Sequence, residues 1–155
     1  MRFARAAATG SAVAAFLCSI GLAQTPARPN FTGTWAMDPA KSELGEMPPT
    51  TSHVLTIVHK EPNITIDREV DGRKDSAPFR TDGVETSFKA ECCGELKSSG
   101  RWEGTTLMRR VGNENITQND AWTLSADGKT LTIVRKVEQG GEGFTLKMVF
   151  SKKNQ

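Results

Sequence analysis

The 155-residue chain has little of what common enzymes and metalloproteins use. It contains no tyrosine and only two histidines, His53 and His59. On an extended strand these two would lie about 20 Å apart, too far to share a metal ion or a proton relay. Asp71 and Asp75 flank a predicted turn and are expected to be solvated loop acids. No Gly-x-Ser-x-Gly, His-Glu-x-x-His or phosphate-binding glycine loop occurs. An enzyme is therefore the least favoured class, and neither a metal nor a cofactor is expected.

Cysteine is also scarce, with three in the chain, of which Cys92 and Cys93 are adjacent. Adjacent cysteines cannot cross-link distant segments, because neighbouring Cα atoms lie ~3.8 Å apart, closer than a disulfide normally requires. The pair has three interpretations: a strained, redox-sensitive ring, two thiols for a soft metal, or two small apolar side chains at a loop edge. We favour the third, so the fold must depend on its core alone.

Long hydrophobic runs are missing after the first residues of the chain. Arg2 and Arg5 precede an uncharged, mostly apolar stretch that ends in Gly-Leu-Ala at 21–23. This pattern predicts a cleavable signal peptide over residues 1–23, and the stretch is short for a membrane span. We therefore expect an exported protein, periplasmic or extracellular after cleavage, that does not span the membrane.

The mature chain lacks a net charge. The full chain has 20 basic and 18 acidic residues, and cleavage would remove two arginines but no acid. A neutral domain has no overall field for nucleic acid, which is therefore not an expected partner. Removing 23 residues from 155 leaves 132, enough for one domain with one core. Residues 24–30, with two prolines, are predicted to be an extended leader, and residues 31–155 the folded domain.

A sustained helical stripe is absent as well. One helical turn is predicted over Pro39–Leu44, with Asp38 as its cap. Elsewhere apolar and polar residues alternate between Gly, Asp and Asn turns, which predicts about nine or ten half-buried strands. Short turns favour hairpins between successive strands. The expected fold class is therefore all-β, a single antiparallel up-and-down barrel of about 8–10 strands.

Residues 31–35, Phe-Thr-Gly-Thr-Trp, resemble the opening motif of the lipocalins and of the wider calycin superfamily. The longer segments 30–42 and 122–133 resemble those of small exported bacterial lipocalin-like proteins. The resemblance therefore touches both ends of the predicted domain, and it implies a lipocalin-like barrel with a small apolar ligand inside. Its motif residues are Phe31, Gly33, Trp35 and Trp122.

The same resemblance implies particular roles at one end of the barrel. Trp35 would begin the first strand and plug the closed end, and Gly33 would allow close packing there. A basic residue from the last strand would cover this tryptophan, and both Lys147 and Lys152 are candidates.

Only three tryptophans are present. In small β domains a tryptophan is usually part of the core, and we expect this of Trp35 and Trp122. Trp102 lies between two glycines and is expected to be more open. It is therefore a candidate for stacking on a ligand.

Three arginines stand where the alternation predicts an inward-facing side chain: Arg68, Arg109 and Arg135. An unpaired buried charge is costly, so their placement needs a reason. One interpretation puts each near a rim, reaching water or pairing with an acid such as Glu103. The other brings the three together in a wet cavity, where they hold an anionic headgroup.

These features favour a non-catalytic function, the binding of a small, partly apolar molecule in the barrel. In one form of this hypothesis the ligand is anionic. The candidate ligand-binding residues are Arg68, Arg109, Arg135 and Trp102. The alternative is a structural or protein-interaction module whose interior is filled by side chains. A cavity of roughly 300 Å³ or more would favour the first, and a filled interior the second.

Overall fold

The computed structural model describes residues 27–45 and 47–154. The predicted signal peptide, residues 1–23, and the first part of the leader lie outside the described residues. Within these residues the chain forms ten β-strands and one short 3₁₀-helix, η1. Their bounds are β1 Gly33–Met37, η1 Pro39–Lys41, β2 His53–Lys60, β3 Asn63–Val70, β4 Arg73–Arg80, β5 Thr86–Ala90, β6 Gly94–Glu103, β7 Thr106–Gly112, β8 Ile116–Leu124, β9 Thr130–Gln139 and β10 Glu142–Lys152.

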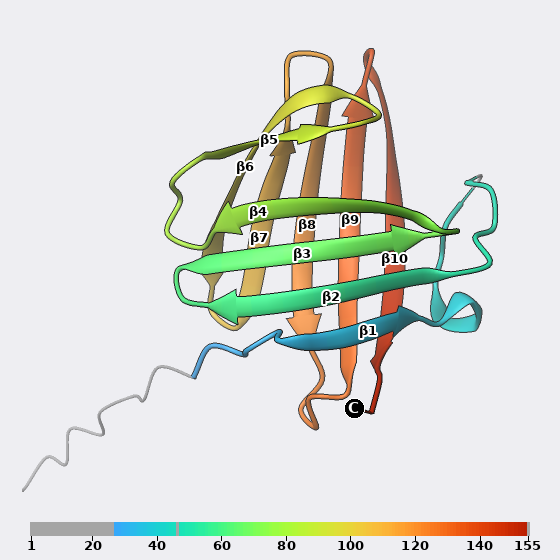
Figure 1. Ribbon diagram of the computed structural model, residues 1–155, viewed down its shortest axis with the longest axis vertical. Helices are drawn as coiled ribbons and strands as arrows, with labels where there is room; N and C mark the ends of the chain where they lie inside the picture. The colour runs from blue at the N-terminus through green and yellow to red at the C-terminus, as the bar shows by residue number, and fades with distance from the viewer. Residues whose placement is uncertain (1–26, 46, 155) are drawn as a thin grey trace, which may run out of the picture.

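All strands belong to one antiparallel sheet in the order β4-β3-β2-β1-β10-β9-β8-β7-β6-β5. Each strand pairs with its neighbour in sequence, except that β1 pairs with β10 and that β4 and β5 form the two ends of the order. Strands β1–β4 cross in front of β7–β10, so the sheet curls into a barrel with two crossing layers (Figure 1). The prediction of a single antiparallel all-β barrel is confirmed.

The end of β4 comes close to β6 at one corner of the barrel. Asp82, just after β4, forms a bridge with Arg101 on β6, and the amide of Gly83 donates to the carbonyl of Gly100 over 2.8 Å. A Cβ at Gly100 would lie 2.9 Å from the ring of Phe79. Glycine at this position therefore lets β6 cross close to the end of β4.

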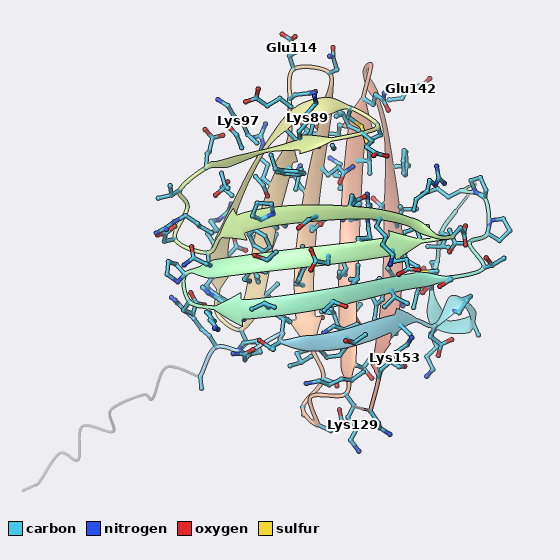
Figure 2. The ribbon with its side chains drawn as sticks, in the orientation of Figure 1. Lys89, Lys97, Glu114, Lys129, Glu142 and Lys153 are labelled. Carbon is cyan, nitrogen blue, oxygen red and sulfur yellow. A yellow bond between two sulfur atoms is a disulfide. The ribbon has the colours of Figure 1, made fainter. Side chains whose placement is uncertain are left out.

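The strands follow from the alternation in the sequence. On β2, Leu55, Ile57 and His59 are buried, while Thr56 and Val58 are exposed. Side chains on a strand point alternately to opposite faces, so such a segment buries one face against the barrel interior. The charged side chains labelled in Figure 2 lie at the two ends of the barrel and point away from it.

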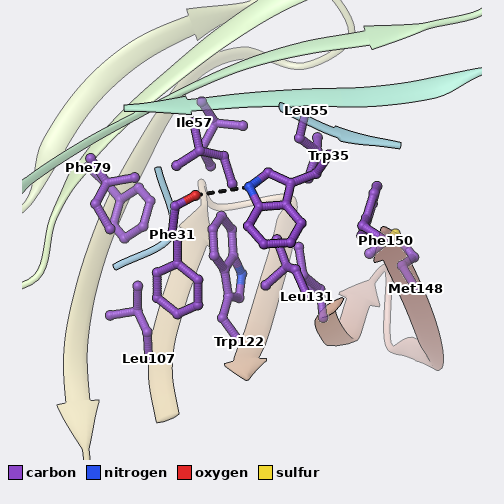
Figure 3. Close-up of a cluster of buried hydrophobic side chains, with 13 residues drawn as sticks. Phe31, Trp35, Leu55, Ile57, Phe79, Leu107, Trp122, Leu131, Met148 and Phe150 are labelled. Atoms are coloured by element: carbon purple, nitrogen blue, oxygen red, sulfur yellow. Dashed lines mark hydrogen bonds between the residues drawn. The ribbon is translucent and has the colours of Figure 1, made fainter. Parts of the chain in front are cut away.

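One half of the interior is packed with apolar side chains. Phe31, Trp35 and Trp122 are almost fully buried there, with aliphatic residues between them (Figure 3). The Nε1–H of Trp35 donates to the carbonyl of Phe31 over 2.9 Å, and this bond satisfies the ring's only polar atom. The rings of Phe31 and Trp122 meet edge to face, with centroids 5.6 Å apart.

Gly33 and Lys152 together cover Trp35. The ammonium of Lys152 lies 5.2 Å from the centre of the Trp35 ring, within the range of a cation–π contact. A Cβ at Gly33 would lie 2.7 Å from Cε of Lys152, and the φ of Gly33 is +147°. The basic residue over the tryptophan is therefore Lys152, whereas Lys147 binds Glu43 over 3.0 Å.

The predicted helical turn is present but shorter than expected, because η1 ends at Lys41. The side chain of Asp38 caps it by accepting from the amide of Ala40 over 3.1 Å. In the described part of the chain no helix is long and apolar enough to cross a membrane.

Candidate functional site

The other half of the barrel holds a cavity of about 90 Å³. Every strand except β1 contributes to its wall, as does the turn between β5 and β6. The apolar part of the wall is Leu55, Ile66, Ala77, Phe88, Ala90, Leu96, Val111, Ile116, Trp122, Ile133, Met148 and Phe150. The volume is below the roughly 300 Å³ of a drug-sized ligand site and large enough for several waters or a compact molecule.

A row of charged side chains lies on three neighbouring strands, and its two arginines line the cavity. Arg109 on β7 lies directly opposite Asp120 on β8, which lies directly opposite Arg135 on β9. Arg135 donates two hydrogen bonds to the carboxylate, Nε to Oδ1 over 2.7 Å and Nη2 to Oδ2 over 2.8 Å. This bidentate geometry is the strongest form of an arginine–carboxylate pair.

Arg109 is held more loosely than Arg135. Its Nη1 lies 3.9 Å from Oδ2 of Asp120, and its Nε donates to Oγ of Ser98 over 3.1 Å. The guanidinium stands 4.7 Å from the centre of the Phe79 ring. The second terminal nitrogen, Nη2, is buried and has no hydrogen-bond partner among the described residues.

A second arginine–aspartate pair reaches the cavity from the other layer. Arg68 on β3 lies opposite Asp75 on β4, and its Nε is 3.1 and 3.0 Å from the two carboxylate oxygens. Both side chains remain more than a third exposed. Asp75, which the sequence predicted to be a solvated loop acid, is therefore a strand residue that faces Arg68. The strand continues closer to the turn than the pattern indicated.

These five ionised groups do not balance. Three guanidinium groups, on Arg68, Arg109 and Arg135, face two carboxylates, on Asp75 and Asp120. One positive charge is therefore left over at this end of the cavity. The buried Nη2 of Arg109 belongs to this group of charges, and it is a donor without an acceptor.

The pKa values of Asp120 and Arg109 show how far neighbouring charges offset the effect of burial. Burial alone would raise the pKa of Asp120, but the charge and hydrogen bonds of Arg135, with Arg109 nearby, outweigh it and lower the pKa below its ordinary value. Burial, together with the charges of Arg135 and Arg68, lowers the pKa of Arg109 to about 10, and the charge of Asp120 opposes this shift. Both groups are therefore ionised at neutral pH.

His53 stands at the start of β2 and lines the same cavity. Burial, together with the charges of Arg68 and Arg135, lowers its pKa to about 4. The ring is therefore neutral at pH 7 and adds nothing to the excess positive charge. Its Nε2 is buried without a hydrogen-bond partner in the part of the chain that the structure describes.

The structure brings together three of the four candidate ligand-binding residues. Arg68, Arg109 and Arg135 all line the cavity, whereas Trp102 does not. Trp102 stacks on Phe31 with ring centroids 6.0 Å apart, because it belongs to the packed half of the barrel. Trp102 therefore lies apart from the arginine cluster.

The partners of the arginines were not found from the sequence. Glu103 was the acid suggested for them, but it points outward and pairs with Arg101 over 2.6 Å. The acid that pairs with two of them, Asp120, was missed. A signal for it existed, because Asp120 precedes Trp122 by two residues and therefore faces the same side of β8.

The packed end of the barrel has its own polar network around Glu61. Its carboxylate accepts from Nε1 of Trp102 over 2.8 Å, from Nε2 of His59 over 3.1 Å and from the hydroxyl of Thr81. Burial would raise the pKa of Glu61, but these hydrogen bonds outweigh it and lower the pKa. Nδ1 of His59 accepts from the amide of Phe31 over 3.3 Å, so every polar atom of this ring has a structural role.

Cys92 and Cys93 form a disulfide between adjacent residues and line the cavity. Of the three interpretations, the ring is therefore the one that the structure contains. No group of three or more His, Cys, Asp or Glu side chains that could hold a metal ion occurs in residues 27–45 and 47–154.

No protein-family model matches the chain, and no curated protein sequence is similar to it. Solved structures do share its fold. Fatty-acid-binding protein 1 of Echinococcus granulosus superposes with a TM-score of 0.63 at 15% identity, over 80% of this chain and 98% of that one. Zebrafish ileal bile acid-binding protein, solved with cholic acid, has a TM-score of 0.60 at 17% identity, over 79% and 98%.

A secretary abundant heat soluble protein of Ramazzottius varieornatus is similar to the same extent. Its TM-score is 0.62 at 16% identity, over 79% of this chain and 94% of that one. At these identities the likeness establishes the fold alone, an antiparallel β-barrel, and leaves the function to be argued from the cavity.

Proposed function

We propose that the chain is a non-catalytic binding protein for a compact, partly apolar molecule that carries one negative charge. The observation that carries the proposal is the single excess positive charge at the cavity, together with the unpartnered Nη2 of Arg109. A carboxylate placed there would neutralise the excess and accept the free hydrogen bond. Charge-assisted bonds of this kind are about twice as strong as neutral ones.

The rest of the wall suits the apolar part of such a molecule. Apolar side chains make up most of it, including Ile66, Val111 and Met148. Ligand sites commonly combine a mostly apolar wall with a few placed polar groups. The volume of about 90 Å³ favours a short or compact acid over a long chain.

Two further observations bear on the proposal, one on binding and one on location. Two of the similar barrels bear names that describe fatty-acid and bile-acid binding, and the second was solved with cholic acid. The pattern of residues 1–23 supports export, so we place this binding outside the cytoplasm, in the periplasm or beyond the cell.

The test is a calorimetric titration with butanoic, octanoic and hexadecanoic acids and with the alcohol that matches each. The wild-type protein should bind at least one acid in preference to its alcohol, by about 10- to 100-fold for one charge-assisted hydrogen bond. Arg109→Gln should lose that preference. Arg101→Gln, an outward-facing arginine, is the matched control and should keep it.

The alternative is a structural or protein-interaction module, and the small cavity is the observation that favours it. Equal binding of acid and alcohol, or an Arg109→Gln protein that is folded and still prefers the acid, would rule out the anion site. Binding of no acid in the series would favour the alternative function.

A further inference from the structure

The disulfide between Cys92 and Cys93 lies in the turn that joins β5 to β6. Phe88, Ala90 and both cysteines line the cavity, so the turn and the end of β5 form part of its wall. Cys92 is exposed and Cys93 is half-buried, so the two residues that line the cavity also meet solvent. The ring therefore stands between the cavity and the surrounding solution.

The turn is held by contacts that do not involve the sulfurs. The amide of Cys93 donates to the carbonyl of Ala90 over 3.4 Å, and the amide group of Asn113 donates to the carbonyl of Cys93 over 3.1 Å. Strands β5 and β6 remain paired from Ala90 and Gly94 onward. Breaking the disulfide would therefore leave the hairpin and the barrel in place.

The disulfide has a local effect that these contacts cannot replace. A ring closed between neighbouring residues removes the rotamer freedom of both side chains and limits the backbone between them. It closes no long loop, so it adds little to global stability. Its consequence is confined to the rigidity of this section of the wall.

We propose that the Cys92–Cys93 disulfide is a redox-responsive wall of the cavity, and that its reduction by a dithiol loosens the turn and weakens retention of the ligand. The inference rests on the proposed binding function and adds a means of regulating it. In the reaction the Sγ–Sγ bond breaks, each sulfur takes up one proton, and the dithiol becomes a disulfide, so two electrons pass to the protein.

The size of the effect follows from the number of groups released. Rigidifying a binding loop strengthens binding mainly by lowering the ordering cost, and each side chain that must be immobilised weakens binding measurably. Two freed cysteine side chains predict a loss of affinity of about 3- to 10-fold, expressed mainly as faster release of the ligand.

The experiment uses the full chain with Cys18→Ser, so that the pair provides the only sulfhydryl chemistry. The oxidised protein and the protein reduced with dithiothreitol are compared in melting temperature and in three further measurements. These are thiol labelling of the folded protein, amide hydrogen exchange over residues 88–96, and affinity for the acid that binds best. The matched control combines Cys92→Ser and Cys93→Ser. It should match the reduced protein in hydrogen exchange and affinity, with or without dithiol, and should take up no thiol label.

Two reactive thiols in a protein with an unchanged melting temperature, faster exchange limited to residues 88–96 and weaker binding are the expected results. A pair that can be reduced only after unfolding, or unchanged exchange in the reduced protein, would overturn the inference. If the oxidised protein binds no acid, the proposed function fails by itself. The hydrogen exchange then decides separately whether the wall responds to reduction.

Discussion

Asp120 is the residue on which the charged cluster depends most directly. It is fully buried, pairs with Arg135 through two hydrogen bonds and lies within 3.9 Å of Arg109. Asp120→Asn would keep the size of the side chain and remove its charge. The cluster would then carry two excess positive charges instead of one, with both arginines still buried.

The expected cost is large because the arginines cannot move to water. Removing one partner of a buried ion pair typically destabilises a protein by about 3–5 kcal/mol, since the remaining charge is left uncompensated. The side chain of Arg109 is only 5% exposed and that of Arg135 is 16% exposed. We therefore expect Asp120→Asn to lower the free energy of unfolding by about 3–5 kcal/mol.

Asp75→Asn is the matched control, because it makes the same chemical change in the second arginine–aspartate pair. Arg68 and Asp75 are 39% and 35% exposed, so water can replace much of their interaction. An exposed pair contributes about 0–1 kcal/mol, and the control should lose no more than that.

Urea unfolding followed by tryptophan fluorescence measures both variants against wild type. Equal slopes with different midpoints would show that stability alone has changed. A loss below about 1 kcal/mol for Asp120→Asn, or equal losses for the two variants, would refute the view that Asp120 offsets the burial of the arginines.

Two further predictions concern other parts of the barrel. Gly33→Ala should destabilise it by about 1–3 kcal/mol, because the φ of +147° is strained for alanine and the new Cβ would meet Lys152. In a Lys152→Ala background the penalty in urea unfolding should shrink; an unchanged penalty would place the obstacle elsewhere. His53 has a pKa of about 4 when folded and 6.5 as its ordinary value, so the unfolded chain takes up its proton first as the pH falls. The stability it contributes is present above pH 6.5 and is lost toward pH 4, on the order of 2 kcal/mol after allowing for its partial exposure. His53→Leu should flatten that part of the pH–stability profile, and an unaltered slope would assign the loss to other groups.

The sequence by itself determined the fold class and the face on which the alternating apolar residues of the strands lie. Both depend on local rules, because side chains alternate along a strand whatever that strand pairs with. The same alternation placed Arg68, Arg109 and Arg135 inside the barrel, where the structure has them. Gly33 and Trp35 could also be recognised from local information, because their motif is contained within five consecutive residues.

Only the tertiary structure decided what those residues meet. Asp120 lies between two arginines because of the register of β7, β8 and β9, and register depends on how all the strands close into one barrel. Trp102 joins Glu61, which is 41 residues away in sequence, instead of the arginine cluster. The volume of the cavity likewise depends on how side chains from nine strands pack together. Such contacts are long-range, and alternation within one strand carries no information about the strand that will lie opposite it.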